Sequence, residues 1–87
     1  MNRRDAAELA LLLGRFIEAV DQSPQLAAEI EGLVIECGKE ESWFDEASEA
    51  LALFVPGGGG YYLDEQGLAE ALKPVAAAMR SVLSTDP

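Results

Sequence analysis

Apolar residues recur at intervals of three and four along most of this chain, and no other sequence feature restricts the fold as much. The segment from Asp5 to Asp21 shows the pattern first, with Leu9, Leu12, Leu13, Phe16, Ile17 and Val20. Residues three and four apart lie on one face of an α-helix, so this segment is predicted to be an amphipathic helix that buries one face. Three later segments repeat the pattern, which predicts an all-α protein.

The second predicted helix covers residues 24–37. Its start is marked by Ser23, whose hydroxyl can accept a hydrogen bond from an early backbone N–H, and by Pro24, which suits the first helical position. The predicted buried face consists of Leu26, Ile30, Leu33, Val34 and Cys37. Gly38 is expected to end the helix in a left-handed conformation.

The third predicted helix follows a possible cap at Ser42, with Asp45 three residues later near the positive end of the helix dipole. Its inward face is predicted to hold Phe44, Ala47, Leu51, Phe54 and Val55, with Trp43 at the edge. Pro56 and the four glycines after it end the helix.

The last predicted helix begins after an Asp64 cap. Its stripe is Leu68, Leu72, Val75, Ala76, Met79, Val82 and Leu83, which keeps a single helical phase from end to end. Because the phase does not reset at Pro74, we expect one helix, kinked where the Glu70 carbonyl loses its backbone donor.

Four helices with short connections predict a compact four-helix bundle, a single domain over residues 1–87, with a Gly-rich loop before the Pro-kinked last helix. An alternative pairs 51–55 with 61–64 as a short β-hairpin, since Val and aromatic residues flank the glycine run. Helices followed by such a hairpin would be winged-helix-like. The usual ligand of that fold is DNA, which the charge of this chain disfavours.

The chain carries 16 acidic residues against 6 Lys and Arg and has no His, giving a net charge of −10. This charge repels nucleic-acid phosphates and anionic lipid, so neither is an expected partner. The glycine run lacks the Gly-Lys-Ser/Thr ending of a phosphate-binding loop, and no acidic spacing typical of a Ca²⁺ site occurs. Asp21-Gln22-Ser23-Pro24 also fails to match the Asp-Ser-Leu attachment site of acyl carrier proteins. We therefore predict no catalytic, cofactor or metal site.

Most of the negative charge comes from residues 29–49, where eight acids face Lys39 alone, for a net charge of −7. Six of these acids are predicted to cluster where the second helix ends and the third begins. We call them the acidic corner: Glu36, Glu40, Glu41, Asp45, Glu46 and Glu49. One interpretation is a solvated face; the other is a protein-binding site, in which Trp43 is a buried anchor ringed by charge. Tyr61 and Tyr62 are candidate contacts of the same site, since tyrosine suits a half-wet interface.

The helical stripes leave several large apolar residues outside: Leu11, Ile35, Leu53, Tyr61 and Tyr62. They could pack under the glycine loop. Otherwise they form an interface, and we name Leu11, Ile35 and Leu53 as candidates for a homodimer contact.

Two functions follow as hypotheses. The first is a non-enzymatic acidic module that masks or competes for a basic surface of a partner protein, as immunity proteins, antitoxins, inhibitors and nucleic-acid mimics do. The second is a homo-oligomeric scaffold or accessory subunit assembled through the exposed apolar residues. The apolar run Leu9 to Leu13 is too short for a signal peptide, so a cytoplasmic location is expected.

Overall fold

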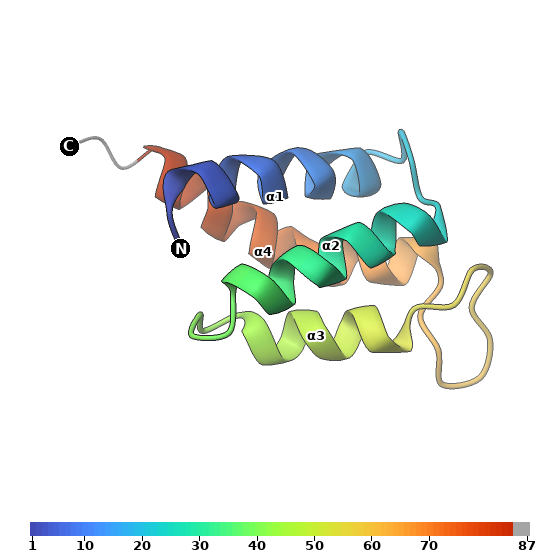
Figure 1. Cartoon of the computed structure of the whole chain (residues 1–87). Coiled ribbons are helices and arrows are strands. Elements are labelled where there is room, and N and C mark those ends of the chain that lie inside the picture. The colour runs from blue at the N-terminus through green and yellow to red at the C-terminus, as the bar shows by residue number, and fades with distance from the viewer. Residues whose placement is uncertain (85–87) are drawn as a thin grey trace.

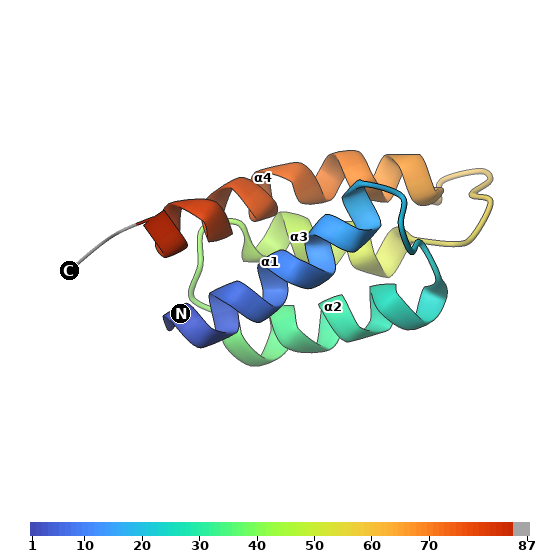
Figure 2. The ribbon, with the colours of Figure 1, turned by 90° about the horizontal axis from the view of Figure 1, so that it is seen from above.

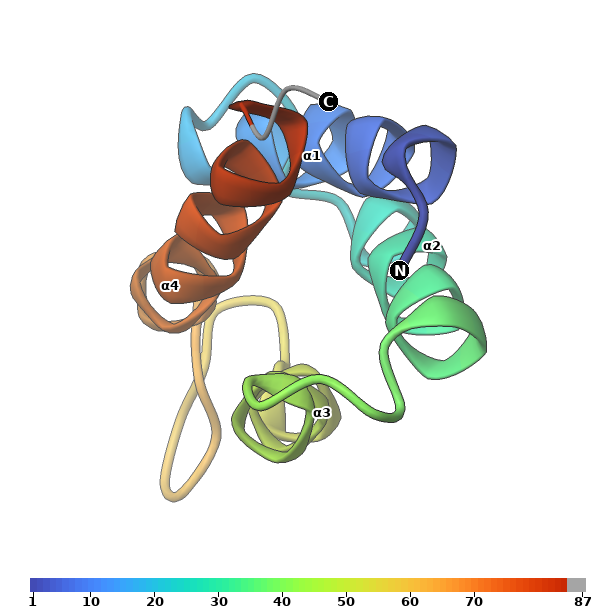
Figure 3. The ribbon, with the colours of Figure 1, turned by 90° about the vertical axis from the view of Figure 1, so that its left-hand side faces the viewer.

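The computed structural model describes residues 1–84, which form four α-helices: α1 (Arg3–Ile17), α2 (Pro24–Cys37), α3 (Phe44–Leu53) and α4 (Glu65–Ser84). Successive helices run in opposite directions (Figure 1). Seen from one end, the four form a ring in which each helix contacts two neighbours, and α1 with α4 makes the most extensive contact (Figure 3). The prediction of an all-α four-helix bundle is confirmed.

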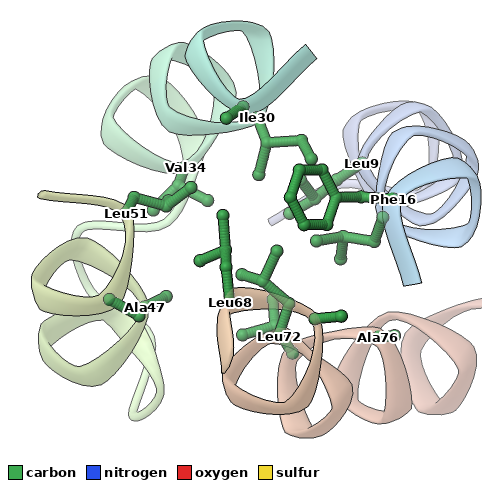
Figure 4. Packing of buried hydrophobic residues seen from close by; sticks show 14 of the residues in the cluster. Leu9, Phe16, Ile30, Val34, Ala47, Leu51, Leu68, Leu72 and Ala76 are labelled. Carbon is green, nitrogen blue, oxygen red and sulfur yellow. The ribbon is translucent and has the colours of Figure 1, made fainter. Parts of the chain in front are cut away.

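The core fills the centre of this ring with side chains from all four helices (Figure 4). Its largest fully buried members are Phe16, Leu9, Leu13, Ile30, Leu68, Leu72, Met79, Val34 and Val75. The rings of Phe16 and Phe54 meet edge to face, with centroids 5.5 Å apart and planes at 84°. Such aromatic pairs stabilise beyond the area they bury. Among the described residues, no polar or charged residue is buried as a whole.

Both predicted boundaries of α2 are correct, but the reason for its end is not the expected one. The Leu26 N–H donates to Ser23 Oγ at 3.1 Å, so the predicted cap forms. Gly38, however, has φ −109°, not the left-handed value expected. A Cβ built on Gly38 would lie 2.6 Å from the Trp43 ring, so glycine is required there by close packing rather than by backbone twist.

The first helix ends four residues earlier than its predicted boundary. Ala19 adopts φ +60°, and the Val20 N–H reaches back to the Arg15 carbonyl at 3.0 Å. The Ala19 N–H also donates to the Phe16 carbonyl at 3.2 Å, which completes a Schellman motif with alanine in the position that usually holds glycine. Val20 therefore lies outside the helix and is 75% exposed, so its predicted place on the buried stripe is wrong.

The predicted cap of α3 is also wrong. Trp43, not Ser42, occupies the N-cap position, and no side chain accepts a hydrogen bond there. The preceding connection is instead closed by turns in which the Glu41 N–H donates to the Gly38 carbonyl and the Phe44 N–H donates to the Glu41 carbonyl. The helix stops at Leu53, so Phe54 packs against the core from outside the helix.

The last helix has the predicted start and is continuous through Pro74. The Gly67 N–H donates to Asp64 Oδ1 at 2.7 Å, which is the expected cap. Five residues of the predicted stripe are buried (Leu68, Leu72, Val75, Ala76 and Met79), while Val82 and Leu83 are half-buried. Pro74 itself faces solvent. A proline on the exposed face removes one hydrogen bond without disturbing the core.

The glycine loop between α3 and α4 extends from one end of the bundle (Figure 2). Two backbone hydrogen bonds close its base, from the Val55 N–H to the Leu63 carbonyl at 2.9 Å and from the Leu63 N–H to the Leu53 carbonyl at 2.8 Å. Only isolated bridges occur there, between Phe54 and Leu63 and between Gly59 and Tyr62. The hairpin alternative is therefore not adopted, although the loop is tied at its base.

Candidate functional site

The acidic corner lies at the end of the bundle where α2 passes to α3 (Figure 1). The glycine loop with Tyr61 and Tyr62 lies at the opposite end, and the molecule measures 45 Å along its longest axis. The sequence predicts that these tyrosines and the corner contact one partner. The structure does not bring them together, so they belong to two separate surfaces.

The carboxylates of the acidic corner face solvent. Glu36, Glu40, Asp45, Glu46 and Glu49 are exposed and Glu41 is half-buried. The salt bridge found within residues 1–84 joins Lys73 Nζ to Glu70 Oε1 at 2.8 Å on α4, and it neutralises none of them. The corner therefore presents a field of negative charge that a cationic surface can reach directly.

Trp43 is the rigid part of this region. Its ring lies against Gly38, and the half-buried side chain packs on the core cluster. A ring held in place by its own chain loses little entropy when a partner covers its remaining exposed edge. The predicted anchor is thus also a structural residue of the α2–α3 connection.

The tyrosines at the other end are more open. Tyr61 is 97% exposed and Tyr62 is 56% exposed. The four preceding glycines all have positive φ, between 58° and 121°, a run that side-chain-bearing residues would not adopt. The Gly57 N–H donates to Glu65 Oε1 at 3.1 Å, so the loop is held against the start of α4. The loop therefore exposes two tyrosine side chains, while a hydrogen bond holds it to the start of α4.

The three candidates for a homodimer contact differ in exposure. Leu11 is 57% exposed on α1 and Ile35 is 44% exposed on α2, whereas Leu53 is half-buried at the end of α3. Leu53 was expected to be left outside by the helical stripe, and the structure covers it in part. Leu11 lies between the buried Leu9 and Leu13 in sequence, so it points away from the core.

Cys37 is half-buried near the N-terminus of α1. Burial raises the pKa of its thiol, and a hydrogen bond with Asp5 and the negative charges of Asp5, Glu36 and Glu8 raise that pKa further. The protonated thiol is a poor nucleophile and a poor metal ligand. Within the part of the chain that the structure describes, no group of three or more Cys, Asp or Glu side chains is arranged to hold a metal ion.

The structure also reveals a groove that was not predicted from the sequence. It lies between α1 and α2, has a volume of about 370 Å³, and is lined by Glu8, Leu12, Glu29, Gly32, Leu33 and Glu36. The residues of α2 occur at i, i+3, i+4 and i+7, a spacing that places them on one face of the helix. That stripe was visible in the sequence, but only the neighbouring α1 turns it into a groove.

Comparisons with known proteins leave the function open. No protein-family model, curated protein or solved structure matches this chain. In addition, no helix within residues 1–84 is long and apolar enough to cross a membrane.

Proposed function

We propose that this protein is a non-enzymatic acidic module that binds and masks a basic surface on a partner protein. The observation that carries the proposal is the acidic corner, a cluster of mostly exposed carboxylates at one end of the bundle, none of which takes part in the salt bridge found within residues 1–84. Carboxylates arranged on a rigid surface attract a cationic partner over about 10 Å at moderate salt and accelerate the encounter.

The cost of this arrangement in the free protein supports a role in binding. Glu36 lies in the last turn of α2, where the helix dipole disfavours a negative charge by about 0.3 to 1 kcal/mol. Asp45 and Glu49 are like charges one turn apart on α3. Such a pair destabilises a helix by roughly 0.2 to 0.5 kcal/mol, about as much as a pair of opposite charges stabilises it. A basic partner would relieve both repulsions.

The test compares two double variants that change the net charge equally. Glu40→Lys with Asp45→Lys alters the corner, and Glu18→Lys with Glu70→Lys alters exposed carboxylates elsewhere. Proteins captured from a lysate of the source organism at low salt should include a basic protein that is released near 1 M salt. With that protein purified, the corner variant should associate about tenfold more slowly and the control much less.

The thermal stability of the corner variant should stay close to that of the wild type, because relief of the repulsion offsets the loss of the favourable interaction between Asp45 and the α3 dipole. If the two double variants bind the captured protein equally well, or if no basic protein is captured, the corner is a solvated face and the proposed function is wrong.

A further inference from the structure

The α1–α2 groove differs from the acidic corner in having an apolar floor. Leu12 and Leu33 are half-buried, pack on the core cluster, and also line the groove. Carboxylates stand on both sides of that floor, Glu8 on α1 and Glu29 and Glu36 on α2, and all three are exposed. The two helices are neighbours in the ring (Figure 3), so a side chain entering between them can touch both.

Gly32 lines this groove and has no side chain to fill it. Glycine inside a helix is less stable than alanine, so its presence in the middle of α2 calls for a reason. Packing does not give one, because a Cβ built on Gly32 meets no heavy atom within 4 Å. Gly38 shows the contrast, since a Cβ there would collide with Trp43. The space above Gly32 faces the groove, where any larger side chain would occupy it.

The lining of the groove specifies the chemistry of its occupant. Apolar walls with a rim of carboxylates suit a side chain that is aliphatic along its stem and cationic at its tip. Arginine matches better than lysine, because its planar guanidinium carries five donors and can bond carboxylates on two helices at once. The flat group can also lie close to the bare backbone at Gly32.

We propose that this groove binds an arginine side chain from an arginine-rich segment of the partner protein. The stem would lie on Leu12 and Leu33, and the guanidinium would bond to the carboxylates of Glu8 on α1 and Glu36 on α2. The proposal rests on the proposed function, and it adds the residue type that is recognised and the place where it is held. Glu36 belongs to both regions, so the groove continues from the acidic corner.

The test blocks the groove without changing any charge. Gly32→Trp fills it, and Ala77→Trp places the same side chain at an exposed position of α4, a helix that does not line the groove. Binding of fluorescent nona-arginine is measured by anisotropy, and circular dichroism verifies that each variant is folded. We expect Gly32→Trp to weaken binding about tenfold, the loss of roughly one charge-assisted hydrogen bond, and Ala77→Trp to change it less than about twofold.

Two further measurements keep the outcome decisive. Gly32→Gln is a smaller block to be used if the tryptophan variant does not fold, and nona-lysine carries the same charge without the guanidinium. Equal binding of nona-arginine by the Gly32 and Ala77 variants would overturn the groove as the site. An equal loss for nona-lysine would overturn the choice of arginine.

These outcomes are separable from failure of the proposed function. If Gly32→Trp does not weaken the binding of nona-arginine, the corner can still be an electrostatic binding surface. The double variant at Glu40 and Asp45 tests the corner independently, with the captured partner. Conversely, if the corner variant bound the captured partner as well as the control variant does, Gly32→Trp would still be expected to weaken the binding of nona-arginine.

Discussion

Replacing Pro74 by alanine is expected to stabilise the protein. Pro74 lies inside α4 on its exposed face, where it withholds a backbone donor from the Glu70 carbonyl. A proline in a helix interior costs about 3 kcal/mol relative to alanine. The alanine variant gives back about 0.4 to 1 kcal/mol because its unfolded chain is less restricted. The net gain in the free energy of unfolding is therefore about 2 kcal/mol, or roughly 10 °C in Tm for a domain of this size.

Urea denaturation followed by far-ultraviolet circular dichroism and by Trp43 fluorescence measures this gain. The slope of the free energy against urea should not change, because the surface exposed on unfolding is the same. Ala77→Pro is the matched control. It adds a proline at another exposed position of the same helix, three residues after Pro74, and should destabilise the protein by about 3 kcal/mol. A lower free energy of unfolding for Pro74→Ala would refute the reasoning. It would mean that the packing of α4 on α1 depends on the proline.

Four further outcomes are expected. The raised pKa of the Cys37 thiol means that folding favours its protonated form, so the free energy of unfolding should fall as the pH rises above the usual thiol value of 9.0, and Cys37→Ala should reduce that fall. Ala19→Gly should stabilise by about 0.5 kcal/mol in urea denaturation, since the left-handed conformation strains alanine; a loss of stability would contradict the Schellman assignment. Ser48→Ala should raise the free energy of unfolding by about 1 kcal/mol, because Ser48 Oγ is buried with no hydrogen-bond partner in the described residues. If the wild type sediments as a dimer, Leu11→Glu or Ile35→Glu should yield monomer, and an unchanged mass would remove those residues from the interface.

Sequence reasoning succeeded where the determinant was local. The Ser23-Pro24 start of α2 and the Asp64 cap of α4 depend on a side chain and a backbone N–H three residues away, and both form as predicted. The single helix through Pro74 followed from the unbroken phase of its apolar stripe.

The errors arose where tertiary contacts or rare conformations decide. Ser42 is an ordinary cap residue, but packing of Trp43 on Gly38 sets where α3 begins. Alanine rarely adopts positive φ, so nothing local marked Ala19 as the end of α1.

In the candidate site, too, local features were predicted correctly and features that depend on tertiary structure were not. The cluster of acids along the chain was evident, but its separation from Tyr61 and Tyr62 needed the direction of each helix. Successive connections of an antiparallel bundle lie at opposite ends, and the 10 residues of α3 alone span about 15 Å. That geometric signal was available before the structure. The α1–α2 groove was not, because it requires knowledge of which helices are neighbours.

The pairing of α1 with α4 has a consequence for synthesis of the chain. The most extensive contact in the bundle joins its first and last helices, so forming it closes a loop that contains everything between them. A chain made from its N-terminus presents the apolar faces of Leu9, Leu13 and Phe16 before their cover on α4 exists. During that interval, the eight acids of residues 29–49 are already in place. We expect their negative charge to oppose association between neighbouring half-made chains until the bundle can close.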